Sequence, residues 1–199
     1  LISNDRIFIV TAQHLVENTA EAAWNVPRAN IIGEPCKRDT APAIAVACGL
    51  VSRRDPQGVV CILTADQLMS DGETFRQTLA DAIQVARKED SIVTIGIQPT
   101  APATGFGYIE TGDAVEMNTV TRFHQATRFV EKPDAYTAAR YVERGNFFWN
   151  SGMFIWRAGV MQAAVQQHAP DLARLCEAVA VAVTPADVDA VMRDVYPSL

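Results

Sequence analysis

A carboxylate follows directly after an apolar run in this chain. Residues Val59–Leu63 read Val-Val-Cys-Ile-Leu without alternation, and Thr64, Ala65 and Asp66 come next. An unbroken apolar run of this length is typical of a parallel strand that is covered on both faces. In open α/β sheets, ligands bind beyond the carboxyl ends of the strands, where an Asp can hold a metal ion or a ligand hydroxyl. Asp66 is therefore a candidate binding residue, and capping of the next turn is the structural alternative.

Other polar stretches could also do chemistry. The stretch Glu34–Ala43 ends at the expected start of a helix, where free backbone N–H groups attract anions. In Thr104–Ile109, two glycines flank Phe106 and would let the backbone approach a ligand closely. The segment Phe129–Pro133 places an acidic and a basic residue side by side, and Trp149–Phe154 lies beyond it. Taken singly, each stretch could also be an ordinary turn or a solvated pair.

The apolar pattern predicts the elements that would position these residues. In the first half of the chain, short apolar runs alternate with segments of helical spacing, including a helix that begins near Thr40 and one over 72–88. The predicted strands are Ile7–Thr11, Ile31–Ile32, Val59–Leu63 and Ile92–Ile97. Strands and helices that alternate with short loops and right-handed crossovers favour a layered α/β/α sandwich.

The second half of the chain changes character. It opens with a loop rich in Pro, Ala, Thr and Gly and continues with shorter strand patterns, the last of them Met-Phe-Ile-Trp. Asp134 can cap a helix that ends at Gly145, because Gly is a common residue just past a helix end. The segment 158–199 has helical spacing, and its last helix begins with Thr184 and Asp187 placed much as in a capping box.

The composition limits the class of protein. The chain has 199 residues, of which 49% are hydrophobic and 20% charged, with a net charge of -6, as expected for a globular protein with a substantial core. Lys and Arg do not cluster and no apolar run is long enough for a membrane span, so we expect neither nucleic-acid nor membrane partners. The cysteines are widely spaced without a CxxC pair, which favours reduced thiols and a cytoplasmic location.

In their order and spacing, the polar stretches closely resemble motifs of the mannose-1-phosphate guanylyltransferases, also called GDP-mannose pyrophosphorylases. The matching motifs are Glu34-Pro35-x-x-Arg38-Asp39-Thr40-Ala41-Pro42, Thr64-Ala65-Asp66, Thr104-Gly105-Phe106-Gly107-Tyr108, Phe129-Val130-Glu131-Lys132-Pro133 and Trp149-Asn150-Ser151-Gly152. The resemblance extends from the first strand to about Pro197. It implies a Rossmann-like three-layer α/β/α sandwich with a mainly parallel central sheet and a helical C-terminal segment.

The resemblance also implies an activity and a division of the chain. In this family GTP and mannose 1-phosphate react to GDP-mannose and pyrophosphate with Mg²⁺. A phosphate oxygen of the sugar phosphate attacks the α-phosphorus of GTP, so the protein mainly positions two polyanions and neutralises charge. The chain would be a partial nucleotidyltransferase domain, with a nucleotide-binding half at 1–98, a sugar-phosphate-binding half at 99–157 and a helical segment at 158–199.

The resemblance assigns roles to particular residues. Asp66 corresponds to a Mg²⁺ ligand, and Lys132 corresponds to the lysine that reaches the sugar phosphate as a point charge. Both would be catalytic. Glu131 would hold sugar hydroxyls, while Gly107 and Asn150 would line the sugar pocket. A further set corresponds to the segment beside the guanine base, and it comprises Glu34, Pro35, Thr40 and Pro42.

Departures from the family pattern lead to further expectations. The family's glycine-rich phosphate loop, GGxGTRLWPLSR followed by a lysine, and its downstream WSDVGSW-like segment with a second metal-binding Asp have no match in residues 1–199. We therefore expect the chain to be an incomplete core that is inactive alone. Gln67 replaces the usual His. Asp39 replaces the usual Asn and adds negative charge near the triphosphate.

Two alternatives remain open at this point. The chain could be a non-catalytic sugar-nucleotide-binding or regulatory module, or it could belong to a related sugar-1-phosphate nucleotidyltransferase with another base or sugar. The resemblance also allows a homo-oligomer of the full-length protein.

Overall fold

The computed structural model describes residues 2–199, which divide into two compact units. The first unit comprises the residues up to Val60 together with Arg157–Leu199, and the second comprises Cys61–Trp156. The expected division at residues 98 and 157 is one of function and stays a prediction. Within residues 2–199, no helix is both long and apolar enough to cross a membrane.

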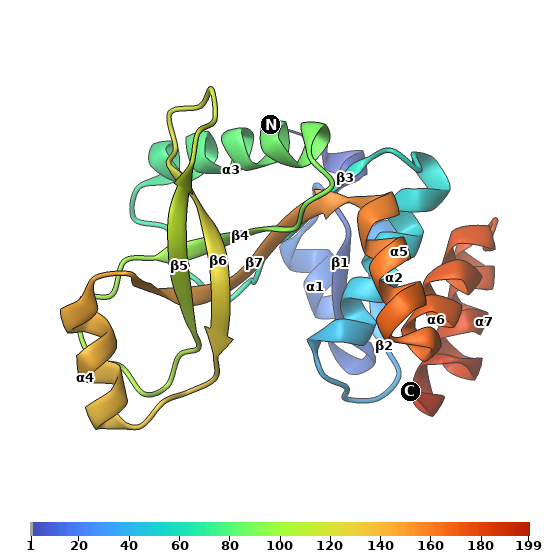
Figure 1. Cartoon of the computed structure of the whole chain (residues 1–199). Helices are drawn as coiled ribbons and strands as arrows, with labels where there is room; N and C mark the ends of the chain where they lie inside the picture. The colour runs from blue at the N-terminus through green and yellow to red at the C-terminus, as the bar shows by residue number, and fades with distance from the viewer. Residues whose placement is uncertain (1) are drawn as a thin grey trace. The chain divides into compact units, whose positions relative to one another are not determined.

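The first unit combines a small parallel sheet with a group of helices (Figure 1). Strand β1 (Ile9–Ala12) pairs in parallel with β2 (Ile31–Glu34), so that Ile9 lies opposite Ile31. The helices are η1 (Asn4–Arg6), η2 (Gln13–Leu15), α1 (Val16–Ala22), η3 (Arg28–Asn30), α2 (Thr40–Arg54), α5 (Ala158–His168), α6 (Pro170–Val181), α7 (Pro185–Asp194) and η4 (Tyr196–Ser198). The parallel β-α-β start predicted from the apolar pattern is confirmed.

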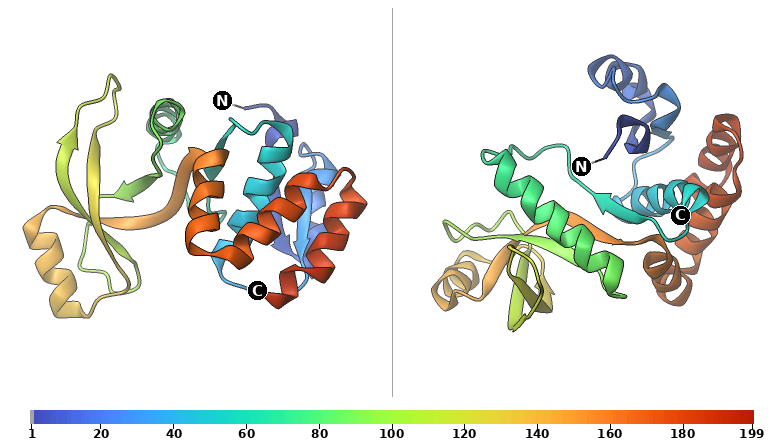
Figure 2. Two further views of the ribbon diagram at one scale, coloured as in Figure 1. Left: turned by 45° about the vertical axis from the view of Figure 1, so that its right-hand side comes forward. Right: turned by 90° about the horizontal axis from the view of Figure 1, so that it is seen from above.

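The core of the first unit lies between helix α2 and the C-terminal helices. Helix α2 packs against α6 and α5, and Figure 2 shows these helices side by side. Val46 and Leu50 on α2, together with Leu175 and Val179 on α6, are almost fully buried. Helix α6 is therefore a principal packing partner of α2.

The second unit is organised around an antiparallel arrangement of strands. Its elements are β3 (Val59–Ile62, which begins in the first unit), α3 (Gly72–Lys88), β4 (Val93–Ile97), β5 (Tyr108–Val115), β6 (Phe123–Val130), α4 (Ala135–Arg144) and β7 (Phe147–Arg157). The strand order is β3-β7-β5-β6, and β4 also pairs with β7. Strand β7 therefore neighbours three other strands.

A mainly parallel central sheet is not what the structure shows. Strands β1 and β2 are parallel, whereas the pairs β4–β7, β5–β6 and β5–β7 are antiparallel. The expectation came from the family resemblance and from unbroken apolar runs, which indicate that both faces of a strand are covered. They carry no information on the direction of the neighbouring strand, and β7, the partner of β4, comes from much later in the chain.

The helix ends follow the predicted capping residues. The backbone N–H of Thr137 donates to Asp134 over 2.7 Å at the start of α4, and Gly145 follows its last residue with a φ of 71°. At the start of α7, the N–H of Thr184 donates to Asp187 over 2.8 Å and the N–H of Asp187 donates to the Thr184 hydroxyl over 3.2 Å. These contacts confirm the capping box.

Helix α4 covers one face of the β5–β6–β7 strands. Tyr141 on this helix packs in a buried cluster with Tyr108, Ala138 and Phe147. Its ring stacks on that of Phe147, with centroids 3.9 Å apart and an interplanar angle of 11°. This packing holds α4 against β5 and β7, the strands that carry Tyr108 and Phe147.

Candidate functional site

Several predicted sugar-binding residues meet at the middle of β7. The backbone N–H of Asn150 donates to the carbonyl of Gly107 over 2.8 Å. A Cβ added to Gly107 would lie 3.3 Å from Oε2 of Glu131 and 3.6 Å from Cβ of Asn150. The structure therefore brings Gly107, Glu131 and Asn150 together, and a side chain at Gly107 would have to move the Glu131 carboxylate slightly.

Glu131 and Lys132 follow strand β6 and are not part of it. Strand β6 ends at Val130, and Lys132 has a φ of 32°, a value that is uncommon for residues other than Gly. The two side chains consequently do not point to opposite faces as they would in a strand, and Nζ of Lys132 lies 3.8 Å from Oε1 of Glu131. The side chain of Lys132 is 64% exposed and that of Glu131 is 76% exposed, so a ligand can reach both.

The loop that carries Asp66 is attached to the same part of β7. Nε2 of Gln67 donates to the carbonyl of Ser151 over 2.5 Å. Asp66 itself is exposed in the loop after β3. A Cβ added to Gly152 would lie 3.2 Å from Cγ2 of Thr64. Asp66, the candidate metal ligand, is therefore the neighbour in sequence of Gln67, which binds Ser151 on β7 beside Asn150.

The segment from Asn150 to Gly152 has a fixed conformation. Its Ser151 hydroxyl donates to the carbonyl of Ile95 on β4 over 2.6 Å and accepts from the N–H of Met153 over 3.1 Å. Oδ1 of Asn150 accepts from the N–H of Gly152 over 3.1 Å, and Gly152 has a φ of 72°. Taken singly, the Asn-Ser-Gly motif predicts a turn, and this prediction is wrong, because Asn150–Gly152 lie within strand β7 where its register against β4 shifts. The anchoring contacts of Ser151 and Gln67 have no signal in the sequence.

Replacing Gly152 with Ala should destabilise the second unit by about 1–3 kcal/mol, because a non-Gly residue is strained at positive φ and the new Cβ would press on Thr64. Thermal unfolding followed by circular dichroism measures the change. Gly105→Ala is the matched control, since no heavy atom lies within 4 Å of a Cβ at that position. Equal melting temperatures for the two variants would contradict the expected strain at Gly152.

The predicted nucleotide-binding residues lie in the first unit. Strand β2 ends at Glu34, and helix α2 begins at Thr40 and buries Pro42 in its first turn. Pro35 is exposed and lines a hollow of about 350 Å³. These four residues therefore belong to one loop-and-helix start, as expected from their motif.

Sequence reasoning missed Tyr196, which contacts this loop. Its ring is fully buried, and its hydroxyl donates to Oε1 of Glu34. Nη2 of Arg38 donates to the carbonyl of Pro197, so the loop contacts turn η4 at two points. Burial and the neighbouring Glu34 carboxylate raise the pKa of Tyr196, and the phenol therefore stays protonated as a donor. The signal in the sequence is only an aromatic residue placed just after the last helix.

Comparison with known proteins decides the family. The family profile described as "Nucleotidyl transferase" matches residues 2–195, nearly all of the chain. The chain belongs to this nucleotidyltransferase family. The α/β nucleotidyltransferase fold expected from the motifs is thereby confirmed.

Relatives within the nucleotidyltransferase family carry a more specific name. The mannose-1-phosphate guanylyltransferase of Escherichia coli (strain K12) is 40% identical over 160 residues, which are 78% of this chain and 33% of that protein. The one of Sinorhizobium fredii (strain NBRC 101917 / NGR234) is 39% identical over 191 residues, which are 96% of this chain and 35% of that protein. The resemblance to the mannose-1-phosphate guanylyltransferases is confirmed, and the chain spans about a third of the length of these curated relatives.

A solved structure agrees with the nucleotidyltransferase fold. The crystal structure described as mannose-1-phosphate geranyltransferase from Thermus thermophilus superposes with a TM-score of 0.80 at 25% identity. The match covers 98% of this chain and 53% of that chain. The arrangement of elements described above is therefore shared with a larger protein of the same fold.

Asp66 has the chemistry of a magnesium ligand in this nucleotidyltransferase chain. Mg²⁺ prefers hard oxygen ligands and is commonly held by one or two carboxylates together with phosphates and water. Asp66 is an exposed carboxylate in the loop bound to the segment Asn150–Gly152 of β7. Within residues 2–199 there is no group of three or more His, Cys, Asp or Glu that could hold a metal ion. The Asp66 carboxylate by itself is an oxygen donor of the kind that Mg²⁺ prefers.

Proposed function

We propose that this nucleotidyltransferase chain is the core of an enzyme that forms GDP-mannose and pyrophosphate from GTP and mannose 1-phosphate. The observation that supports the proposal most is the meeting of Gly107, Glu131 and Asn150 at one segment of β7, with Lys132 beside Glu131 and the Asp66 loop bound to the same segment. The relatives named mannose-1-phosphate guanylyltransferase support the choice of substrates.

The sugar phosphate would be held by charge and by hydrogen bonds. The Lys132 ammonium would bind the phosphate as a compact point charge, and the Glu131 carboxylate would accept hydrogen bonds from sugar hydroxyls. Gly107 would allow the sugar to approach the backbone, because it carries no side chain. The rings of Phe106 and Trp149, with centroids 5.0 Å apart, would form an apolar wall on which the sugar ring can lie.

The guanine base of the nucleotide would be held by the motif that begins at Glu34. Glu34, with one oxygen bound by Tyr196, would accept N–H groups of the guanine edge. Mg²⁺ held by Asp66 and the phosphates would neutralise charge at the α-phosphorus. The phosphate oxygen of mannose 1-phosphate then forms a bond to that phosphorus while the bond to pyrophosphate breaks, and no protein nucleophile is needed.

The proposal is tested by pyrophosphate release and by competition between nucleotides. The full gene product should release pyrophosphate when GTP, mannose 1-phosphate and Mg²⁺ are all present, and it should release none when any one of the three is left out. Labelled GTP should be displaced by GTP far better than by UTP or dTTP. Equal displacement by UTP would contradict the guanine assignment. Binding of GTP without any pyrophosphate release by the full gene product would favour the non-catalytic alternative.

Replacing Gly107 with Ala should raise the KM for mannose 1-phosphate about tenfold and leave the fold intact. The added Cβ would lie 3.3 Å from Oε2 of Glu131 and displace a carboxylate whose hydrogen bonds are worth about 1.5–3 kcal/mol. Steady-state kinetics of the full gene product measures the effect. Gly72→Ala serves as the control, because Gly72 lies at the start of α3 outside the predicted sugar site and its added Cβ would lie 3.5 Å from Nη1 of Arg76, an ordinary contact. An unchanged KM in Gly107→Ala would show that the sugar does not depend on Glu131.

A further inference from the structure

A hollow lined by arginines lies along one side of helix α4. Its volume is about 200 Å³, and its lining consists of Arg128, Thr137, Arg140, Tyr141 and Arg144. The α4 residues recur at spacings of three and four, which places them on one side of the helix. Arg128 reaches the same hollow from strand β6. The hollow shares no residue with the predicted sugar site.

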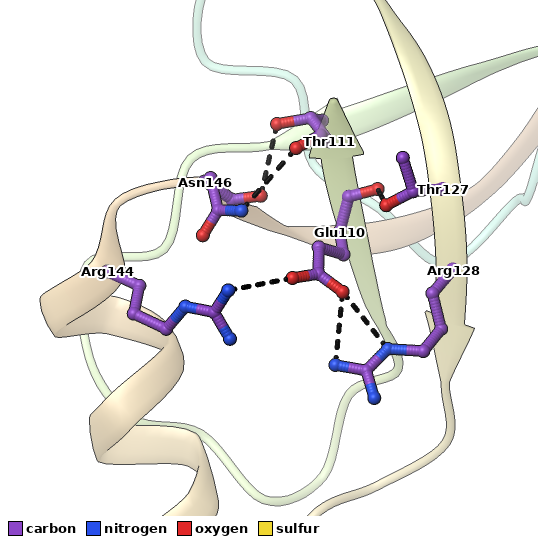
Figure 3. A network of polar contacts seen from close by, with 6 residues as sticks. All are labelled: Glu110, Thr111, Thr127, Arg128, Arg144 and Asn146. Carbon is purple, nitrogen blue, oxygen red and sulfur yellow. Dashed lines mark hydrogen bonds and ion pairs between the residues drawn. The ribbon is translucent and has the colours of Figure 1, made fainter. Parts of the chain in front are cut away.

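Two of these arginines are held in place by Glu110 (Figure 3). Nε of Arg128 donates to Oε2 of Glu110 over 3.1 Å, and Nη2 of Arg144 donates to Oε1 over 3.0 Å. Both guanidinium groups also lie over the ring of Phe147, at 5.9 and 5.2 Å from its centroid. About half of each arginine side chain is exposed. The two cations are therefore ordered in advance and still open to a ligand, which lowers the entropic cost of binding.

The charges around the hollow do not balance. Three guanidinium groups line it, and Glu110 offsets only one of their charges. Arg140 makes no ion pair within residues 2–199, and its guanidinium carbon lies 5.9 Å from the centroid of the Tyr136 ring. Like charges that share a small site repel one another, and an anion between them would relieve that repulsion.

We propose that this hollow is a binding site for a small phosphate group, either inorganic phosphate or the phosphoryl end of a phosphate monoester. Guanidinium groups bind phosphate oxygens through paired N–H donors, and Arg128, Arg140 and Arg144 supply three such groups to the lining. The volume of about 200 Å³ is below the range of about 300–1,000 Å³ that is usual for drug-sized ligands. A single phosphate group therefore fits better than a nucleotide.

The experiment is a titration of the full chain with inorganic phosphate at constant ionic strength. Binding is followed by calorimetry and by shifts of the backbone amide signals of Thr137 and Arg140. Arg140→Gln should weaken binding about five- to tenfold, and it leaves both contacts of Glu110 in place. Arg122→Gln is the matched control, since Arg122 is an exposed arginine of the same unit that does not line the hollow. Equal weakening by the two variants, or no binding at all, would overturn the proposal.

A second variant separates this site from the sugar-phosphate site. Lys132→Ala should leave phosphate binding in the hollow unchanged, whatever it does to the proposed enzyme activity. Loss of phosphate binding in Lys132→Ala together with full binding in Arg140→Gln would locate the anion at Lys132 and overturn the proposal. Repeating the titration with glycerol 3-phosphate distinguishes the sources, because tighter binding than that of inorganic phosphate identifies a phosphate ester as the ligand.

Discussion

Replacing Asp66 with Asn should lower pyrophosphate release by the full gene product by about 10²–10³-fold. The side chain keeps its shape but loses the charge that would hold Mg²⁺ beside the phosphates, and metal stabilisation of transition-state charge is worth several kcal/mol. Asp66 lies exposed in the loop after β3. The melting temperature should therefore stay within about 2 °C of the original, because surface substitutions of this kind usually change stability by less than about 0.5 kcal/mol.

The Mg²⁺ dependence of the rate distinguishes a metal ligand from a residue with another role. Asp66→Asn should need more Mg²⁺ to reach half of its residual rate, whereas Asp113→Asn, a change of another exposed carboxylate in the second unit, should behave as the original. Full activity of Asp66→Asn at the original Mg²⁺ concentration would remove Asp66 from the proposed site.

Replacing Tyr196 with Phe should raise the KM for GTP about tenfold or more and change kcat much less. The hydroxyl donates to Glu34, and hydrogen bonds to charged groups contribute about 1.5–3 kcal/mol. Without it, the Glu34 carboxylate would lose its fixed orientation toward the base. Selection of GTP over UTP should decrease in parallel, because Glu34 is the residue proposed to read the guanine edge.

The position of Tyr196 calls for a stability control, since its ring is fully buried. Tyr136→Phe removes a hydroxyl from a tyrosine that is 73% exposed and should leave both KM and melting temperature unchanged. A fall of the melting temperature of Tyr196→Phe with an unchanged KM for GTP would mean that Tyr196 only stabilises the fold. Recovery of kcat at saturating GTP is the result expected for a positioning residue.

Local chemistry made much of this structure predictable. The capping residues Asp134 and Thr184 mark the starts of α4 and α7 correctly, because a cap depends on residues within one turn of the helix. Gly145 marks a helix end for the same reason. The meeting of Gly107, Glu131 and Asn150 came from the resemblance to a family and could not have come from the spacing of these residues alone.

The parts that could not be predicted depend on contacts between distant segments. The antiparallel pairing of β4 with β7 brings together residues from far apart in the chain, and an apolar run contains no information on its neighbour. Tyr196 and Glu34 are separated by most of the sequence, and no local sequence pattern predicts the hydrogen bond between them. The positive φ of Lys132 also has no signal in the sequence, because such a φ is uncommon for residues other than Gly.

Strand β7 also has a consequence for the order of folding. Its segment Asn150–Gly152 is held by β4 through Ser151, by Gly107 just before β5, and by the loop after β3 through Gln67. Each of these contacts closes a long stretch of chain, and the entropy of closing a loop must be overcome before the contact stabilises anything. We therefore expect the sugar site to form late, together with the whole second unit.

Amide hydrogen exchange would make this order visible. The N–H groups of Asn150 and Met153, which donate to Gly107 and Ser151, should exchange only when the second unit unfolds globally, at the rate of the most protected amides in α3. Faster exchange at Asn150 than in α3 would mean that the segment Asn150–Gly152 opens by itself. This segment would then be a less cooperative part of the second unit instead of the place where several of its long loops are closed.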